Sequence, residues 1–172
     1  MMISITTIRT KNWSARLIHI GMWLWFKLRG LPTQTCYNHV EVRFGNMTSG
    51  AIDSGVKTRK WEDYVKSKSG KYFQYKNYQL NLTSEQLKNG IKYLQNSENI
   101  SYEFENFFWH LIKIITGKWL GDKTSKKTYC YEHAIRFMNS TGKYDLNVFM
   151  NPYEFEVYAE KNLKQFEGQL VE

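Results

Sequence analysis

The segment 39–44 alternates strictly between polar and apolar residues, and no other feature of the chain constrains its fold so strongly. Successive side chains of a β-strand point to opposite faces of the sheet, so this alternation predicts a strand with one apolar and one polar face. It is the clearest strand in the chain. The apolar face holds Val40, Val42 and Phe44, and the polar face holds His39, Glu41 and Arg43.

Three further segments have strand character. Residues 3–8 are β-branched and roughly alternating, and residues 72–82 contain a second alternating run. Glycine, asparagine and serine are frequent in 45–50, which predicts a loop. Residues 51–56 then form the returning strand of a hairpin.

Helices are predicted from apolar spacing of three and four residues together with capping residues. The first helix begins at the Ser14 cap, runs through Leu28 and stops at Gly30 and Pro32. A second begins at the capping box of Thr83 and Gln86, and a third covers 104–115. The last two run from Cys130 to Gly142 and from Asn151 and Pro152 onward. Together with the strands, they predict an α+β fold in which a small antiparallel sheet is flanked by helices.

The length of 172 residues, without an internal repeat or linker-like segment, predicts one domain over 1–172. The net charge of +8 favours encounter with anionic partners without naming one. The most apolar run, 17–26, is too short for a bilayer, which needs about 20 residues. We recognise no cleavable signal. We therefore expect a cytoplasmic protein, unless another route delivers it elsewhere.

Cys130 is the candidate nucleophile. It opens a predicted helix, where the helix dipole and backbone N–H groups stabilise a thiolate, and Lys126 and Lys127 act in the same direction. A nucleophile needs a base within hydrogen-bonding reach, and the base needs an orienting partner. His39 is the candidate base. Cys36 precedes a strand and is expected to be an ordinary loop thiol.

Asp53 is the expected orienting partner of His39. If Ile52 shares the buried face of the strand 39–44, Asp53 projects from the face that carries His39. Glu41 competes for this role, because it lies two residues from His39 on the same strand and face. The alternation therefore favours a His39–Asp53 pair and keeps Glu41 as the alternative.

Six short segments carry a recognisable order of motifs. They are Trp25-Phe26, Tyr37-Asn38-His39-Val40-Glu41-Val42, Ala51-Ile52-Asp53-Ser54, Lys57-Thr58-Arg59-Lys60-Trp61, Ile100-Ser101-Tyr102-Glu103-Phe104 and Tyr129-Cys130-Tyr131-Glu132-His133-Ala134. In this order the chain resembles the circularly permuted papain-like thiol hydrolases of the NlpC/P60 type, including the YiiX/YaeF-like group, and more distantly the lecithin retinol acyltransferase-like proteins. The resemblance covers nearly the whole chain, although the fourth segment lacks the family's proline.

The resemblance implies a permuted papain-like fold, with a small sheet or half-barrel, and a Cys-His-Asp triad. Cys130 would be the nucleophile, His39 the general base and acid, and Asp53 the residue that orients His39. Tyr102 would assist the oxyanion site, together with the backbone N–H of Cys130. Tyr131 stands where the family has a small residue, and we expect its bulk to narrow the cleft.

The implied activity is that of a cysteine peptidase, amidase or acyl transferase working through a thioester acyl-enzyme. The implied substrates are peptides, including those of bacterial cell walls, isopeptides, or lipid amides and esters. No metal and no organic cofactor is required. One alternative is an inactive member of the fold that serves as a binding or assembly module. Nucleic-acid binding driven by the charge is a third hypothesis, and it lacks a recognition motif.

Overall fold

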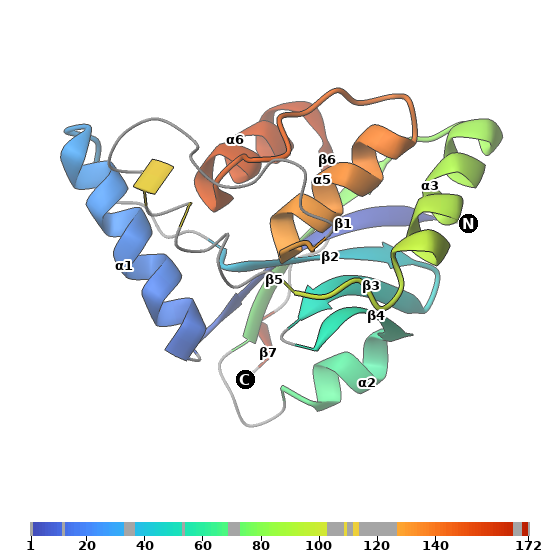
Figure 1. The fold of residues 1–172 in the computed structure, drawn as a ribbon, viewed down its shortest axis with the longest axis horizontal. Helices are drawn as coiled ribbons and strands as arrows, with labels where there is room; N and C mark the ends of the chain where they lie inside the picture. Colours follow the sequence, from blue (N-terminus) through green and yellow to red (C-terminus); the bar gives the residue numbers. More distant parts are fainter. Residues whose placement is uncertain are drawn as a thin grey trace.

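A computed structural model describes residues 2–11, 13–32, 37–52, 54–68, 73–102, 109, 112–113, 127–166 and 170–171. These residues form an α+β fold, as the sequence predicts, with one antiparallel sheet and helices on both of its faces (Figure 1). The strands are β1 (Ile3–Thr10), β2 (His39–Phe44), β3 (Met47–Ile52), β4 (Gly55–Lys60), β5 (Phe73–Leu80), β6 (Lys164–Phe166) and β7 (Leu170–Val171). The helices are α1 (Trp13–Leu28), α2 (Trp61–Lys66), α3 (Ser84–Ser97), α5 (Cys130–Ser140) and α6 (Pro152–Asn162).

The strand order of the sheet is β4-β3-β2-β1-β5-β6, and β7 also pairs with β5. The strand predicted over 39–44 is β2, with the same bounds. It lies between β1 and β3, so both of its edges are hydrogen-bonded. Position 39 is set by its pairing with Ile8 of β1, because the pairs of β2 with β3 involve residues 42–44.

The hairpin that follows β2 differs from the prediction. Phe44 pairs with Met47, so only Gly45 and Asn46 form the turn, and Gly45 adopts a φ of 58° that suits glycine. The returning strand is β3, not 51–56, which instead spans the end of β3 and the start of β4. The loop expected over 45–50 is thus mostly strand.

This short turn also changes which residues face the core. Val42 lies opposite Ser49, and alternation then places Ala51 on the same buried face. Ile52 lies on the other face, with His39. The expectation that Ile52 shares the apolar face of β2 is therefore wrong by one residue.

Two of the predicted helix starts and one predicted stop are confirmed, and one predicted cap is wrong. Thr83 and Asn151 both form complete capping boxes, and Gly142 follows α5 with a φ of 73°. Ser14 does not cap α1, because that helix already begins at Trp13. Of the helix predicted over 104–115, only 109, 112 and 113 are described, and they are helical; the rest lies outside the described residues.

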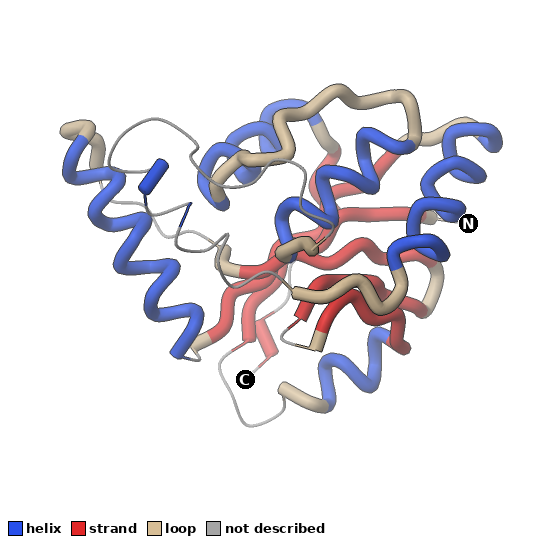
Figure 2. Tube along the Cα trace, viewed as in Figure 1, coloured by secondary structure: helices blue, strands red, loops and turns tan. Residues whose placement is uncertain are grey.

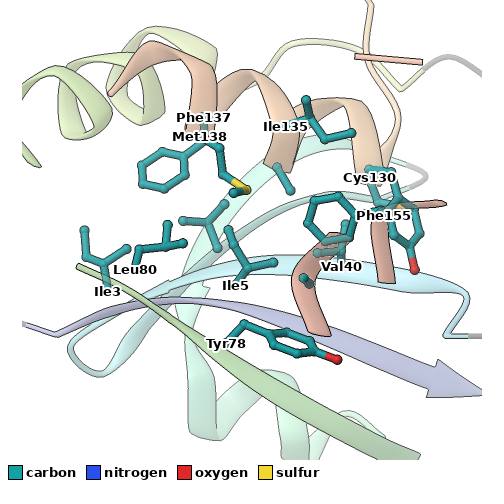
Figure 3. Packing of buried hydrophobic residues seen from close by; sticks show 14 of the residues in the cluster. Ile3, Ile5, Val40, Tyr78, Leu80, Cys130, Ile135, Phe137, Met138 and Phe155 are labelled. Atoms are coloured by element: carbon teal, nitrogen blue, oxygen red, sulfur yellow. The ribbon is translucent and has the colours of Figure 1, made fainter. Parts of the chain in front are cut away.

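Helices cover the two faces of the sheet unequally (Figure 2). On one face, α3, α5 and α6 bury the main core, which includes Ile5, Val42 and Phe137 (Figure 3). On the other face, α2 packs Tyr64 against residues of β1 and β5. His39 pairs with Ile8 on this second face, so the start of β2 is enclosed from both sides.

Candidate functional site

Cys130 is the first residue of α5, which confirms the helix start predicted for it. The preceding residue, Tyr129, has extended backbone angles, and α5 packs across β2 and β3. The cysteine is 4% exposed and belongs to the main core, where Figure 3 shows it beside Val40 and Phe155. A helix N-terminus carries partial positive charge, so this position stabilises a thiolate.

His39 is the first residue of β2, and its side chain is 16% exposed. Its Nε2 donates a 2.7 Å hydrogen bond to Oε1 of Glu41. Cys130 lies close enough to His39 for its charge and a hydrogen bond to raise the pKa of the imidazole. Because Nε2 is used by the carboxylate, Nδ1 is the nitrogen left for the thiol. The structure thus brings together the two residues that the sequence paired as nucleophile and base.

The pKa of His39 is raised to about 9. Burial alone would lower it, but the negative charge and hydrogen bond of Cys130 outweigh burial, and the hydrogen bond and charge of Glu41 add to the rise. An imidazole with this pKa is protonated at neutral pH. The arrangement therefore favours an imidazolium between Cys130 and the buried Glu41.

Glu41 is fully buried and accepts hydrogen bonds from three side chains. Oε1 accepts from His39 and, at 2.6 Å, from Nη2 of Arg59, whereas Oε2 accepts from Oγ1 of Thr48 at 3.0 Å. Burial by itself would raise the pKa of Glu41. The bonds and charges of these donors outweigh it and hold the pKa below its usual value, so the carboxylate stays ionised.

The Glu41 carboxylate occupies the space that a side chain at position 50 would fill. A Cβ at position 50 would lie 2.6 Å from Oε2 of Glu41, closer than such atoms approach in proteins. On its other side, the guanidinium of Arg59 stacks 4.3 Å from the ring centroid of Tyr64 in α2. Glu41 is thus enclosed by β3, β4 and α2, which fixes its direction toward His39.

Asp53, the expected third member of the triad, lies outside the described residues. The structure brings Glu41, the alternative, into direct contact with His39. The sequence argument for Asp53 used the placement of Ile52, which the register of β3 overturns. Glu41 needed no such assumption, because residues i and i+2 of a strand always share a face.

Tyr102 lies next to the segment that leads into Cys130. It forms a parallel bridge with Thr128, and the backbone N–H of Thr128 donates to the carbonyl of Ser101 at 3.1 Å. The Tyr102 side chain is partly buried and packs against the main core. The part of Tyr102 in an oxyanion site stays a prediction.

Tyr131 does not line a cleft as expected. It is buried, its ring packs edge-on against Phe155, and its hydroxyl donates a 2.6 Å hydrogen bond to the carbonyl oxygen of Tyr37. The large side chain of Tyr131, at a position where the resembled family has a small residue, is thus buried in the core. Tyr131 adjoins Cys130, and Tyr37 lies two residues before His39, so this bond connects the two sides of the site.

His133 lies on α5, three residues after Cys130, and its ring is fully buried. Its Nε2 lies 3.3 Å from Oγ of Ser49, and its Nδ1 lies 3.3 Å from the hydroxyl of Tyr93. Burial lowers the pKa of His133 to about 4. With both nitrogens bonded and the ring neutral, His133 is a structural residue rather than a second base.

Among the residues that the structure describes, no group of three or more His, Cys, Asp or Glu side chains is placed to hold a metal ion. The site consists of a thiol, an imidazole and a buried carboxylate on an α+β scaffold. No model of a known protein family matches the chain, and no curated protein does. The function is therefore argued from this geometry.

Sequence reasoning missed Thr48, Gly50 and Arg59, which surround Glu41. The first two were recoverable. A Gly-Asn pair between apolar residues is a two-residue hairpin signal, and that turn sets Thr48 opposite Arg43 and Gly50 two residues further on, on the same face as Thr48. Arg59 gave no local signal, because its position depends on the pairing of β4 with β3.

Proposed function

We propose that the protein is a cysteine hydrolase of the permuted papain-like kind. Cys130 acts as the nucleophile, His39 as the general base and acid, and Glu41 as the residue that orients His39. The observation that carries the proposal is the hydrogen-bonded series from Cys130 through His39 to the buried Glu41, together with the raised pKa of His39. Residues with strongly perturbed pKa values that contact a nucleophile are typical of active sites.

The first half of the reaction forms a thioester. The proton of the Cys130 thiol passes to His39, and the thiolate attacks the carbonyl carbon of an amide or ester. The carbonyl oxygen gains the electron pair and is stabilised by the backbone N–H of Cys130 and the dipole of α5, with Tyr102 assisting. His39 then gives its proton to the leaving amine or alcohol as the bond to it breaks.

The second half restores the enzyme. Neutral His39 takes a proton from water, and the resulting hydroxide attacks the thioester carbonyl. The bond to sulfur breaks, the carboxylic acid leaves, and the thiolate of Cys130 again faces the imidazolium of His39. If an amine or alcohol replaces water, the same steps transfer the acyl group to it.

Glu41 acts through His39 rather than on the substrate. By accepting the proton on Nε2, it turns Nδ1 toward the thiol, and its negative charge stabilises the imidazolium. Arg59 and Thr48 keep this carboxylate in place. The four charges of Cys130, His39, Glu41 and Arg59 sum to zero, which is favourable for a buried cluster.

The family resemblance supports three substrate classes: peptides, isopeptides, and lipid amides or esters. All three present a carbonyl that a thiolate attacks, and none requires a metal or an organic cofactor. The proposal is therefore tested first with a small activated ester, which demands no particular binding cleft.

The test uses p-nitrophenyl acetate and mass spectrometry of the labelled chain. We expect acetylation of Cys130, followed by slow hydrolysis, and a loss of about 100-fold or more in the acetylation rate in His39→Ala. Cys130→Ser should show no thioester. Cys36 is the reference thiol, and its labelling should be the same in all three proteins.

Equal acetylation of Cys130 in the wild-type and His39→Ala proteins would remove His39 as the base. If Cys130 in the folded protein reacts no faster than Cys36, the hydrolase proposal fails. A non-catalytic binding module then becomes the better interpretation of the same fold.

A further inference from the structure

Helix α1 has apolar side chains on two opposite faces. Its inner face packs against Tyr153 at the start of α6, and the rings of Phe26 and Tyr153 meet edge-on at 4.8 Å between centroids. The other residues of this inner cluster are Ile18, Met22 and Trp25. This packing accounts for the attachment of α1 to the body of the protein, at one end of the molecule in Figure 1.

The outer face of α1 presents a second apolar set to solvent. Ile20, Trp23 and Leu28 are 55%, 45% and 60% exposed. Arg16 and Lys27 are exposed on the same side, because at 100° per residue all five lie within an arc of about 140°. Nζ of Lys27 lies 4.9 Å from the ring centroid of Trp23. A helix that is apolar on two faces buries only one of them in this protein.

The charged side chains of the first forty residues, which include α1, are all of one sign. The first acidic residue of the chain is Glu41, although the whole chain has 16 acidic residues. Before it come five basic residues, Arg9, Lys11, Arg16, Lys27 and Arg29. The segment that contains α1 thus contributes only cationic charges, which are complementary to an anionic surface.

We propose that the outer face of α1 docks on the surface of an anionic lipid bilayer, with the helix in the plane of the interface. Trp23 sits at the depth that tryptophan prefers, Ile20 and Leu28 enter the acyl boundary, and Arg16 and Lys27 extend their charged ends to the headgroups. Nucleic acid would contact only the basic side chains of this face, and Ile20 and Leu28 would stay exposed to water.

The dimensions agree with docking rather than spanning. α1 has 16 residues, or about 24 Å of helix, which is less than the hydrocarbon core of a bilayer. Within the described part of the chain, no helix reaches the length and apolarity needed to cross a membrane.

Docking through α1 would also orient the candidate site. His19 on α1 lies within hydrogen-bonding reach of Asn38, the residue before His39. The end of β2 that carries His39 is thus tied to the docked helix. The docking itself does not depend on the proposed hydrolase activity, and Cys130→Ser should bind lipid as the wild-type protein does.

Sedimentation with lipid vesicles tests the proposal. We expect the full chain to bind vesicles of phosphatidylcholine with about one third phosphatidylglycerol, and to bind pure phosphatidylcholine vesicles far more weakly. The triple variant Ile20→Gln/Trp23→Gln/Leu28→Gln should lose about tenfold or more in partitioning. Val157→Gln is the control, because Val157 is an exposed apolar residue of a different helix, α6.

A second pair of variants tests how much the basic side chains contribute to vesicle binding. Arg16→Gln/Lys27→Gln should weaken binding at least about fivefold more than Lys66→Gln/Lys164→Gln, which removes the same charge from exposed positions elsewhere. Circular dichroism checks that each variant is folded. For the unaltered protein, amide hydrogen exchange of α1 should slow when anionic vesicles are added.

Three results would overturn the proposal. The first is a wild-type protein that does not sediment with anionic vesicles. The second is a folded triple variant that binds as tightly as Val157→Gln. The third is outer-face variants that change self-association or DNA binding while vesicle binding stays the same, which would assign this face to a second copy of the chain or to nucleic acid.

Discussion

The hydroxyl of Tyr131 and the carbonyl of Tyr37 are joined by a 2.6 Å hydrogen bond inside the core. This bond links the first turn of α5, which carries Cys130, to the segment that leads into β2 and His39. The backbone N–H of Asn38 also donates to the carbonyl of Ile8, which fixes the same segment to β1. The distance between nucleophile and base is therefore set by contacts that neither residue makes itself.

Tyr131→Phe should loosen this link while keeping the ring packed against Phe155. We expect a loss of about 1 kcal/mol in the free energy of unfolding, since one buried hydrogen bond is removed. The acetylation rate of Cys130 should fall as well, because His39 is held less firmly. Tyr129→Phe is the control, since the bonds of its hydroxyl to the carbonyls of Val148 and Met150 are longer, at 3.4 and 3.5 Å. A larger kinetic effect in the control would contradict this role for Tyr131.

Gly50→Ala should displace the carboxylate of Glu41. The added methyl group has no space above position 50, so we expect a loss of about 1–3 kcal/mol in the free energy of unfolding, typical of overpacking. The cause is tested by a double-mutant cycle with Glu41→Ala, measured by urea unfolding. If Glu41 is the obstacle, Gly50→Ala costs clearly less in the Glu41→Ala background. Additive costs would show that the strain arises elsewhere.

Glu41→Gln and Asp53→Asn distinguish the two candidate partners of His39. The first substitution removes a buried charge that faces Arg59 and His39, so it should destabilise the protein by about 3 kcal/mol or more and slow acetylation of Cys130. Asp53→Asn should have a smaller effect on both. The two variants are compared by urea unfolding and by the rate with p-nitrophenyl acetate. A reversed order would return the orienting role to Asp53.

Features encoded within a few neighbouring residues were predictable from the sequence. β2 was found with its full bounds because its alternation is local, and the boxes at Thr83 and Asn151 marked the starts of α3 and α6. α2 gave no such signal, since it follows β4 directly and Lys60 caps it without a side-chain hydrogen bond. The two-residue and three-residue strands at the C-terminal end are likewise too short to leave a pattern.

The site was predictable only in part, because it depends on pairing between strands. Cys130 and His39 were each predicted from local sequence: Cys130 from its place at a helix start, and His39 from its place on the polar face of a strand. Which carboxylate meets His39 depended on the register after β2, and a turn of two residues instead of a longer loop moved every later residue of β3 to the opposite face. Arg59 entered the site through the next pairing along the sheet.

The titration of His39 tests the ion pair directly, without a substrate. Its folded-state pKa of about 9 exceeds the ordinary value of 6.5, so its contribution to stability is complete below pH 6.5 and is lost as the pH rises toward 9. NMR of the imidazole protons should show His39 titrating near 9 and His133, the internal contrast, near 4. Cys130→Ser should lower the pKa of His39, because the facing negative charge is gone, and His39→Gln assigns the signal. If His39 titrates near 6.5 and does not respond to Cys130→Ser, the thiolate and imidazolium do not form a pair, and the hydrogen-bonded series from Cys130 to Glu41 cannot support catalysis in the way proposed.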